Sequence, residues 1–303
     1  MKKILLTGGS GLLATNWAIQ KRDTCDVVLG FHERIVSIKG VQSVLVNLTS
    51  PELFGNNLDK IKPDLVIHTA ALSNVDYCEK EPSVAAQVNI GLSGNVAVAC
   101  SERSIPLVHI STDHLFSGDK QFVSETDDVQ PLNIYAQTKA DAERKVIQLY
   151  PSALIIRTNF FGWGTSYRRS FSDEVLATLR NRQAKNLFDD VYYSPIVISE
   201  LVDAVHELSQ KKESGIFHVS SKDRISKYTF GIALSEIFGL NNSVLKRGSI
   251  SERPELVRRP KDMSLSNAKL EAVLGRGMGD VKDHLQKLFE QEKQGVANEL
   301  QQL

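Results

Sequence analysis

Short apolar runs alternate with stretches of helical periodicity through the first half of the chain. The apolar runs are each short enough for one buried strand. They cover residues 3–7, 26–30, 44–46, 64–68, 105–110 and 153–157. Apolar residues recur at helical spacing between them, at residues 12–22, 51–60, 83–103 and 135–150. Strictly alternating strands and helices predict an α/β fold with a doubly wound parallel sheet.

The second half of the chain is less regular. Its pattern predicts an aromatic and glycine-rich loop, three helices, two strands and a C-terminal amphipathic helix of about 20 residues that serves surface packing or an oligomer contact such as a homodimer. The loop is 160–164, the helices are 170–180, 198–210 and 226–239, and the strands are 186–190 and 215–219. We therefore expect one domain over residues 1–158 and a smaller lobe over residues 159–303, with some segments of the lobe returning to the sheet.

A glycine turn joins the first strand to the first helix. Gly8 and Gly11 would let the backbone turn tightly and approach a pyrophosphate, whose charge the helix N-terminus favours. Ala14 stands where a third glycine is usual and still permits close helix packing. The turn therefore predicts a dinucleotide site, a Rossmann unit, formed by Gly8, Ser10, Gly11, Leu12 and Leu13.

The residues that end the second strand bear on which dinucleotide binds. A carboxylate commonly takes the ribose hydroxyls of NAD at this position. Here His32 and Arg34 could pair with a 2′-phosphate, which favours NADP, whereas Glu33 keeps NAD open. All three could also be solvated loop residues.

Other strand ends complete this expected cofactor site. Asn47 and Leu48 end the third strand, where an adenine would lie. Thr69, Ala70 and Ala71 end the fourth strand, and their small side chains would let the cofactor pass close to the backbone.

Charge and cysteine content exclude several classes of protein. The 303 residues include 36 basic and 36 acidic side chains, and a zero net charge argues against nucleic-acid binding. No apolar run reaches the roughly 18 residues of a membrane span, so we expect a soluble, cytoplasmic protein. Three scattered cysteines, Cys25, Cys78 and Cys100, show no metal-binding spacing and are expected to be reduced thiols.

Candidate chemistry follows the fifth strand. Thr112 lies directly after it, and Tyr135 and Lys139 are four positions apart, which places them one turn apart on one face of a helix. The ammonium could lower the phenol's ordinary pKa of about 10. Such a group suits proton transfer to a carbonyl oxygen while a hydride moves to the carbon, with Thr112 holding the same oxygen. A Tyr and a Lys at this spacing also occur on many solvated helices.

Taken together, these motifs resemble extended short-chain dehydrogenases/reductases over nearly the whole chain. Within that superfamily the chain is most similar to dTDP-4-dehydrorhamnose reductases. The likeness rests on residues 7–14, 68–71, 74–79, 111–118, 157–162, 190–196 and 259–260, together with Tyr135 and Lys139. The resemblance implies a catalytic triad of Thr112, Tyr135 and Lys139, in which Tyr135 protonates a 4-keto oxygen and NADPH delivers hydride.

The resemblance also assigns supporting residues. It implies that Asn89 supports the lysine through water, next to the cofactor. The substrate contacts that it implies are Asn74, Asp113, His114, Phe116, Asn159, Phe160 and Arg259.

Several positions depart from the family pattern. His114 replaces a tyrosine, Phe160 a tryptophan, and residues 191–193 and 196 also differ. Because these positions face the substrate in the family, a nucleotide-linked 4-keto sugar is expected, but dTDP-4-dehydrorhamnose itself is not favoured.

Three other functions are alternatives to reduction for a chain with these motifs. A 4,6-dehydratase would carry a glutamate where His114 stands, so elimination is disfavoured. A C4 epimerase with retained NAD uses the same triad and stays open. The regulatory subunit of methionine adenosyltransferase, a non-catalytic binding partner, is also similar to this family.

Overall fold

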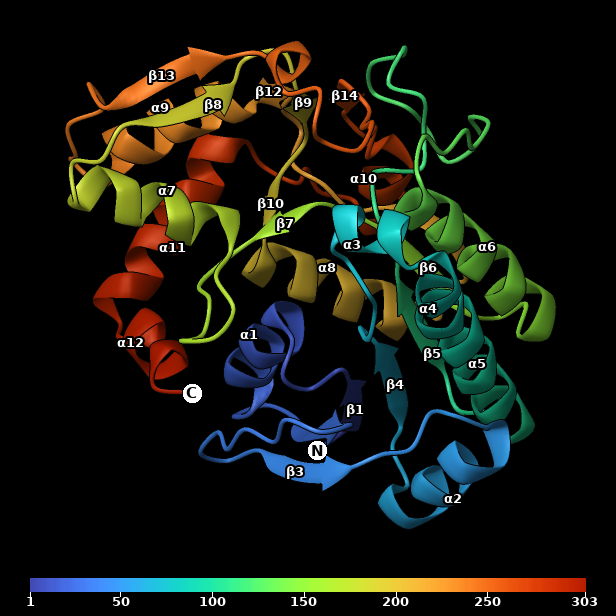
Figure 1. Ribbon diagram of the computed structural model, residues 1–303. Coiled ribbons are helices and arrows are strands. Elements are labelled where there is room, and N and C mark those ends of the chain that lie inside the picture. The colour runs from blue at the N-terminus through green and yellow to red at the C-terminus, as the bar shows by residue number, and fades with distance from the viewer.

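A seven-stranded parallel sheet forms the central layer of the protein (Figure 1). This computed structural model describes all 303 residues. The strand order is β3-β2-β1-β4-β5-β6-β11, which contains the 3-2-1-4-5-6 order of dinucleotide-binding sheets and confirms the predicted fold class. The strands are β1 (Lys3–Thr7), β2 (Asp26–Phe31), β3 (Gln42–Leu45), β4 (Leu65–His68), β5 (Leu107–Ile110), β6 (Leu154–Arg157) and β11 (Gly215–His218).

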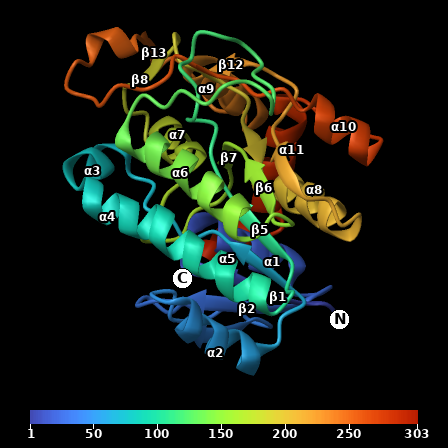
Figure 2. The same cartoon turned by 90° about the vertical axis from the view of Figure 1, so that its right-hand side faces the viewer.

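Helices cover both faces of this sheet. The helices of the whole chain are α1 (Leu12–Lys21), α2 (Pro51–Ile61), α3 (Val75–Lys80), α4 (Pro82–Ala86), α5 (Leu92–Glu102), α6 (Ile134–Leu149), α7 (Phe171–Arg180), α8 (Ile198–Gln210), α9 (Lys227–Ile237), α10 (Ala268–Leu274), α11 (Val281–Lys293) and α12 (Val296–Gln301). Some of them, such as α7, α9 and α11, pack instead on one another and on the short strands of the second half. Figure 2 shows α5 and α6 side by side on one face.

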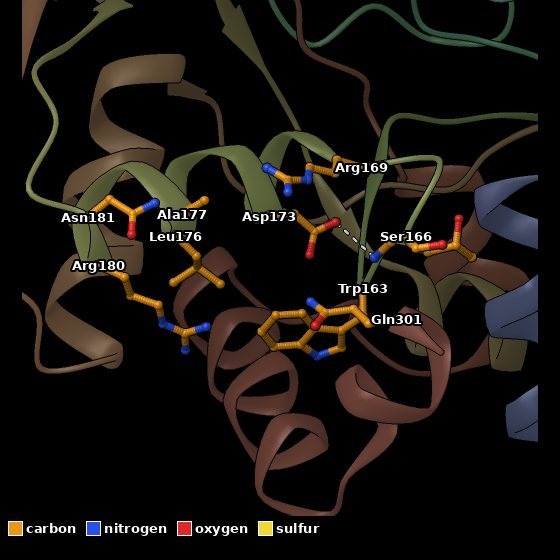
Figure 3. A pocket seen from close by; sticks show the side chains of 11 residues that line it. Trp163, Ser166, Arg169, Asp173, Leu176, Ala177, Arg180, Asn181 and Gln301 are labelled. Carbon is orange, nitrogen blue, oxygen red and sulfur yellow. Dashed lines mark hydrogen bonds between the residues drawn. The ribbon is translucent and has the colours of Figure 1, made fainter. Parts of the chain in front are cut away.

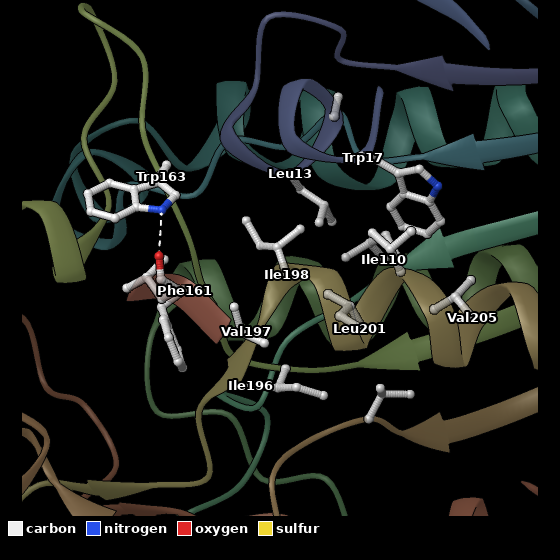
Figure 4. Close-up of a cluster of buried hydrophobic side chains, with 14 of the residues drawn as sticks. Leu13, Trp17, Ile110, Phe161, Trp163, Ile196, Val197, Ile198, Leu201 and Val205 are labelled. Atoms are coloured by element: carbon white, nitrogen blue, oxygen red, sulfur yellow. Dashed lines mark hydrogen bonds between the residues drawn. The ribbon is translucent and has the colours of Figure 1, made fainter. Parts of the chain in front are cut away.

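Successive residues of each strand point to opposite faces of the sheet, so they belong to two separate hydrophobic cores. Ile4 and Leu6 of β1 belong to a cluster of 47 buried residues, whereas Leu5 belongs to a cluster of 15 on the other face. In Figure 4, Trp17 of α1 and Leu201 of α8 meet in the larger cluster. Burial on both faces explains why these strands are continuously apolar.

The predicted helix over residues 83–103 is divided by one π-helical turn, Gln87–Gly91. The whole stretch Pro82–Glu102 has the length and hydropathy of a membrane span, contrary to the expectation that no apolar run of the sequence is long enough for one. In the structure α5 packs between α2 and α6 against the sheet, with Val96 and Ala97 fully buried. Its apolar character is thus accounted for by packing in the protein core.

The second half of the chain contains short strands that the sequence did not reveal. Phe160–Phe161, expected in a loop, is strand β7 and pairs with β10 (Ile196–Val197). The strand expected at 186–190 is β8 (Lys185–Phe188), which pairs with β13 (Leu245–Gly248). A third small sheet joins β9 (Tyr192–Tyr193), β12 (Ile225–Ser226) and β14 (Asp262–Met263).

The C-terminal segment is two helices, not the single helix that was expected. Gly295, at φ 86°, separates α11 from α12. Ala297 and Leu300 of α12 are buried, and Glu299 forms an ion pair with Arg22 next to α1. The segment therefore packs onto the N-terminal helix, as the adjacent red and blue ribbons of Figure 1 illustrate.

Candidate active site

The proposed catalytic residues meet at the carboxyl ends of β5 and β6. Ser111 extends β5 by donating its N–H to the Ile156 oxygen (2.7 Å), so that Thr112 stands at the end of the strand. Helix α6 begins beside it, because the Asn133 side chain caps the helix by accepting the Ala136 N–H (2.9 Å). Tyr135 and Lys139 then lie on successive turns of α6, and the Thr112 hydroxyl is a hydrogen-bonding neighbour of the phenol.

The net shift of the Tyr135 pKa is upward in this structure, whereas a lowered pKa was expected from the neighbouring Lys139. Burial raises the pKa of Tyr135 to about 12, and the hydrogen bond with Thr112 offsets this only in part. The Lys139 ammonium instead donates to the Ile110 carbonyl oxygen (2.8 Å). Tyr135 therefore holds its proton firmly at neutral pH and is set up as an acid rather than a base.

Lys139 itself is buried next to a histidine. Burial lowers its pKa to about 8, although Glu143 acts in the opposite direction. Its Nζ is 3.4 Å from His109 Nε2, and burial also holds the pKa of His109 well below its ordinary value. His109 is thus a neutral neighbour of Lys139, and no sequence motif had singled it out. His68 behaves as a structural residue, bonded to Thr7 Oγ1 (2.7 Å) and Ser93 Oγ (3.1 Å).

A cavity of about 750 Å³ extends over the glycine turn along the ends of β1, β2 and β4. It brings together most of the cofactor residues expected from the sequence. These are Gly8, Ser10, Gly11, His32, Arg34, Leu48, Thr69, Ala70 and Ala71. Glu33, considered above as a ribose partner, also lines the cavity, and the lining is completed by Gly9, Gly30, Phe31, Val46, Thr49, Gln87, Val88, Leu92, Tyr167 and Arg168.

The glycine turn fits the backbone of a dinucleotide. Gly8 has φ +69°, and a Cβ on it would lie 2.9 Å from the Ala70 backbone. Helix α1 starts at Leu12 with no side-chain cap, so its first N–H groups are free for an anion. Leu12 and Leu13 can contribute only through these backbone groups, because the Leu13 side chain is buried in the core.

Asn47 and Asn89, which were predicted to lie next to the cofactor, do not line the cavity. The Asn47 side chain closes a local turn by accepting the Thr49 N–H (2.9 Å). Asn89 lies in the π-helical turn, where it accepts the Leu72 N–H (2.8 Å) and donates to Thr138 Oγ1 (3.0 Å). Asn89 thus fastens α6 to the end of β4 and makes no direct contact with Lys139.

The end of β2 offers a cation for the ribose side of the cavity. The Arg34 guanidinium stacks 4.3 Å above the Tyr167 ring, and Tyr167 donates its hydroxyl to the Ser10 oxygen (2.9 Å). His32 and Glu33 are both more than four-fifths exposed and face each other at 3.6 Å.

A second cavity of about 400 Å³ lies against His114. The His114 ring meets the Tyr135 ring edge-on, with 5.7 Å between centroids, so this cavity adjoins the catalytic tyrosine. Besides His114 and Arg259, its lining includes Phe171, Lys185, Val191, Lys227, Arg253 and Met263. Lys227 and Arg253 had not been singled out from the sequence, because neither belongs to a recognisable motif.

The other predicted substrate residues have different surroundings. Asp113 is buried and accepts a hydrogen bond from Asn159 Nδ2 (2.7 Å). Arg259 forms an ion pair with Asp76 (2.7 Å), which joins the 250–261 segment to α3. Phe160 is half-buried in β7.

Asn74 and Phe116 serve the framework in this structure. Asn74 caps α3 by accepting the Tyr77 N–H (2.9 Å). Phe116 is 3 % exposed in a small cluster with Leu115, Val123 and Leu265.

A third cavity, of about 460 Å³, lies between α7, α12 and the loop that follows β7 (Figure 3). It contains Arg169, Asp173 and Arg180 but none of the catalytic residues. The neighbouring Tyr167 and Arg168 face the cofactor cavity instead. Of the cavities described, the second is the one that adjoins Tyr135, through His114.

Comparisons with known proteins agree with this geometry. Residues 1–294 match the RmlD substrate binding domain family. The chain is 30% identical over 284 residues to the probable low-salt glycan biosynthesis reductase Agl14 of Haloferax volcanii, covering 92% of this chain and 95% of that protein.

Two further similarities bear on function and fold. The chain is 27% identical over 282 residues to mouse (Mus musculus) methionine adenosyltransferase 2 subunit beta, covering 90% and 82% of the two chains. A crystal structure of dTDP-4-dehydrorhamnose reductase from Bacillus anthracis in complex with NADP superposes with a TM-score of 0.83 at 23% identity, covering 96% of this chain and all of that one. The chain belongs to the RmlD substrate binding domain family of extended short-chain dehydrogenases/reductases.

Proposed function

We propose that the protein is an NADPH-dependent reductase of a nucleotide-linked 4-keto sugar, acting in the cytoplasm. The observation that carries this proposal is that Thr112, Tyr135 and Lys139 meet in a protein that also has a cavity over its glycine turn and a second cavity that adjoins Tyr135 through His114. Residues 1–158 would hold the cofactor and residues 159–303 the sugar nucleotide.

The three residues have separate roles in this proposal. Tyr135 donates its phenolic proton to the carbonyl oxygen, and Thr112 donates a hydrogen bond to the same oxygen. Lys139 keeps a positive charge behind the phenol as it loses its proton. A bound NADPH would supply the hydride.

An epimerase uses the same three residues, and it would be distinguished from a reductase by a cofactor that stays tightly bound through purification. Arg34 at the end of β2 supports NADPH as the reductant, because a guanidinium suits a 2′-phosphate.

Replacement of Tyr135 by Phe tests the proposal. Since general acids contribute about 10²–10⁴ in rate, Tyr135→Phe should lower kcat by that factor while NADPH affinity stays within about twofold. Fluorescence titration with NADPH and steady-state kinetics measure the two effects. Unchanged turnover in the variant would remove Tyr135 from the mechanism.

The similarity to methionine adenosyltransferase 2 subunit beta favours a second candidate, a cofactor-binding regulatory subunit. Such a protein would bind NADPH with no turnover of any keto sugar. It would also change the activity of a partner enzyme, and Tyr135→Phe would leave that effect intact.

A further inference from the structure

Lys227 holds an unpaired charge in the second cavity. It is the first residue of α9, and its Nζ lies 3.3 Å from the centroid of the Tyr193 ring and 4.9 Å from that of Phe171. Aromatic faces stabilise the ammonium but do not use up its hydrogen-bond donors. The ammonium forms no hydrogen bond or ion pair within the protein, so its three donors are free for a ligand in the cavity.

The other cations of this cavity are already neutralised. Lys185 pairs with Glu174 (3.0 Å), Arg259 with Asp76 (2.7 Å) and Arg253 with Glu255. The nearby Asp113 carboxylate is engaged by Asn159 (2.7 Å) and Thr112 (3.3 Å) and lies beyond ion-pair distance of Lys227. Lys227 is therefore the cation of this cavity that has no ion-pair partner.

Unsatisfied polar atoms surround the same place. His114 Nδ1, Arg259 Nε and the Tyr193 hydroxyl are buried without any hydrogen-bond partner. Buried polar groups are normally paired, so such a gathering indicates a missing ligand with oxygen atoms.

We infer that Lys227 binds a carboxylate carried by the sugar of the substrate, so that the enzyme prefers acidic nucleotide-linked sugars over neutral ones. This inference rests on the proposed nucleotide-sugar specificity. Lys227 shares its cavity with His114, whose ring contacts Tyr135, and so it lies on the reacting side of the site. A neighbouring cavity of about 370 Å³ offers a diphosphate another cation, Arg258, which forms no ion pair within the protein.

The experiment measures binding by isothermal titration calorimetry in the presence of saturating NADP. The ligands are UDP-glucuronic acid, UDP-glucose and UDP, with the dTDP analogues of all three in parallel. The first two differ only in a carboxylate against a hydroxymethyl group. The proteins are the wild type, Lys227→Met, which keeps a similar stem over the aromatic rings, and Lys227→Arg, which keeps the charge. Lys185→Met is the matched control, because Lys185 is already paired with Glu174.

The wild type should bind the glucuronic acid derivative about tenfold or more tightly than the glucose derivative, in line with a charge-assisted hydrogen bond. Lys227→Met should abolish that preference and leave glucose-derivative affinity within about twofold, whereas Lys227→Arg and Lys185→Met should retain it. Equal wild-type affinities, an unchanged preference in Lys227→Met, or equal weakening of all three ligands would each overturn the inference.

Failure of the inference can be told apart from failure of the proposed function. Turnover of neutral keto sugars with no acidic preference contradicts only the role of Lys227. A Lys227-dependent preference in binding, without turnover of any keto sugar, contradicts only the reductase proposal. If none of the nucleotides binds, both are wrong.

Discussion

Lys139 is the residue whose protonation near neutral pH should control the reaction. With its pKa lowered to about 8, the side chain is an ammonium below that pH and a neutral amine above it. Because the cation stabilises the phenolate that Tyr135 becomes, kcat should be level in the acidic range and fall as pH rises through about 8.

The pH dependence of kcat at saturating substrate and NADPH measures this effect. Lys139→Arg, which stays charged, should lose the fall at alkaline pH even if its rate is lower. A wild-type profile that stays level well above pH 8, or that rises there, would contradict the role given to Lys139.

Individual residues also mark the limit of prediction from sequence. Thr112, Tyr135 and Lys139 could be chosen because strand ends and helical spacing fix their positions locally. The direction of the pKa shift of Tyr135 could not be predicted, because it depends on burial by segments that are far apart in the chain. Lys227 could not be identified from the sequence for the same reason, because only the fold brings it near Asp113.

Helix α6 is fastened to the sheet by a buried ion pair. Arg157 of β6 and Glu143 of α6 are each 3 % exposed, and Arg157 NH2 donates to Glu143 Oε2 at 2.7 Å. Since α6 carries both Tyr135 and Lys139, this pair also sets the position of the catalytic residues.

Glu143→Gln should therefore destabilise the protein strongly. It leaves the Arg157 guanidinium buried without a counter-charge, at a cost of about 3–5 kcal/mol in the free energy of unfolding. Urea denaturation measures the loss. Asp141→Asn is the matched control, since it breaks the exposed pair with Arg144 on the same helix and should cost at most about 1 kcal/mol. Similar losses in the two variants would refute the importance of the buried pair.

Elements differ in how far the sequence specified them. The inner strands of the main sheet, β1, β2, β4, β5 and β6, were predictable because each is an apolar run buried on both faces, whereas the edge strand β3 is largely exposed. Strands such as β7 and β9 have only two residues each and form by pairing with distant segments. No local periodicity of the sequence therefore indicates them. The C-terminal helix was predicted too long because Gly295 was not recognised as a break.

At the scale of the whole molecule, both halves of the chain share one core. Trp17 of α1 and Trp163 of the loop after β7 belong to the same cluster of 47 buried residues. Trp163 donates its indole N–H to the Leu288 oxygen of α11 (3.1 Å), as Figure 4 shows. A continuous core predicts that the two halves unfold together.

The two tryptophans allow this to be tested separately in each half. Trp17→Phe leaves only Trp163 as the fluorescent reporter, and Trp163→Phe leaves only Trp17. In each variant the urea midpoint from fluorescence should coincide with the midpoint from circular dichroism. Distinct midpoints for the two signals would show that the halves are independent folding units.

The central claim, reduction of a nucleotide-linked keto sugar, is tested most directly by following NADPH absorbance. The purified protein would be mixed with a panel of nucleotide-linked 4-keto sugars, neutral and acidic, with NADH in parallel. The account predicts that at least one panel member is reduced, faster with NADPH than with NADH, and that Tyr135→Phe is inactive on it. Tight NADPH binding without oxidation by any panel member would contradict the account.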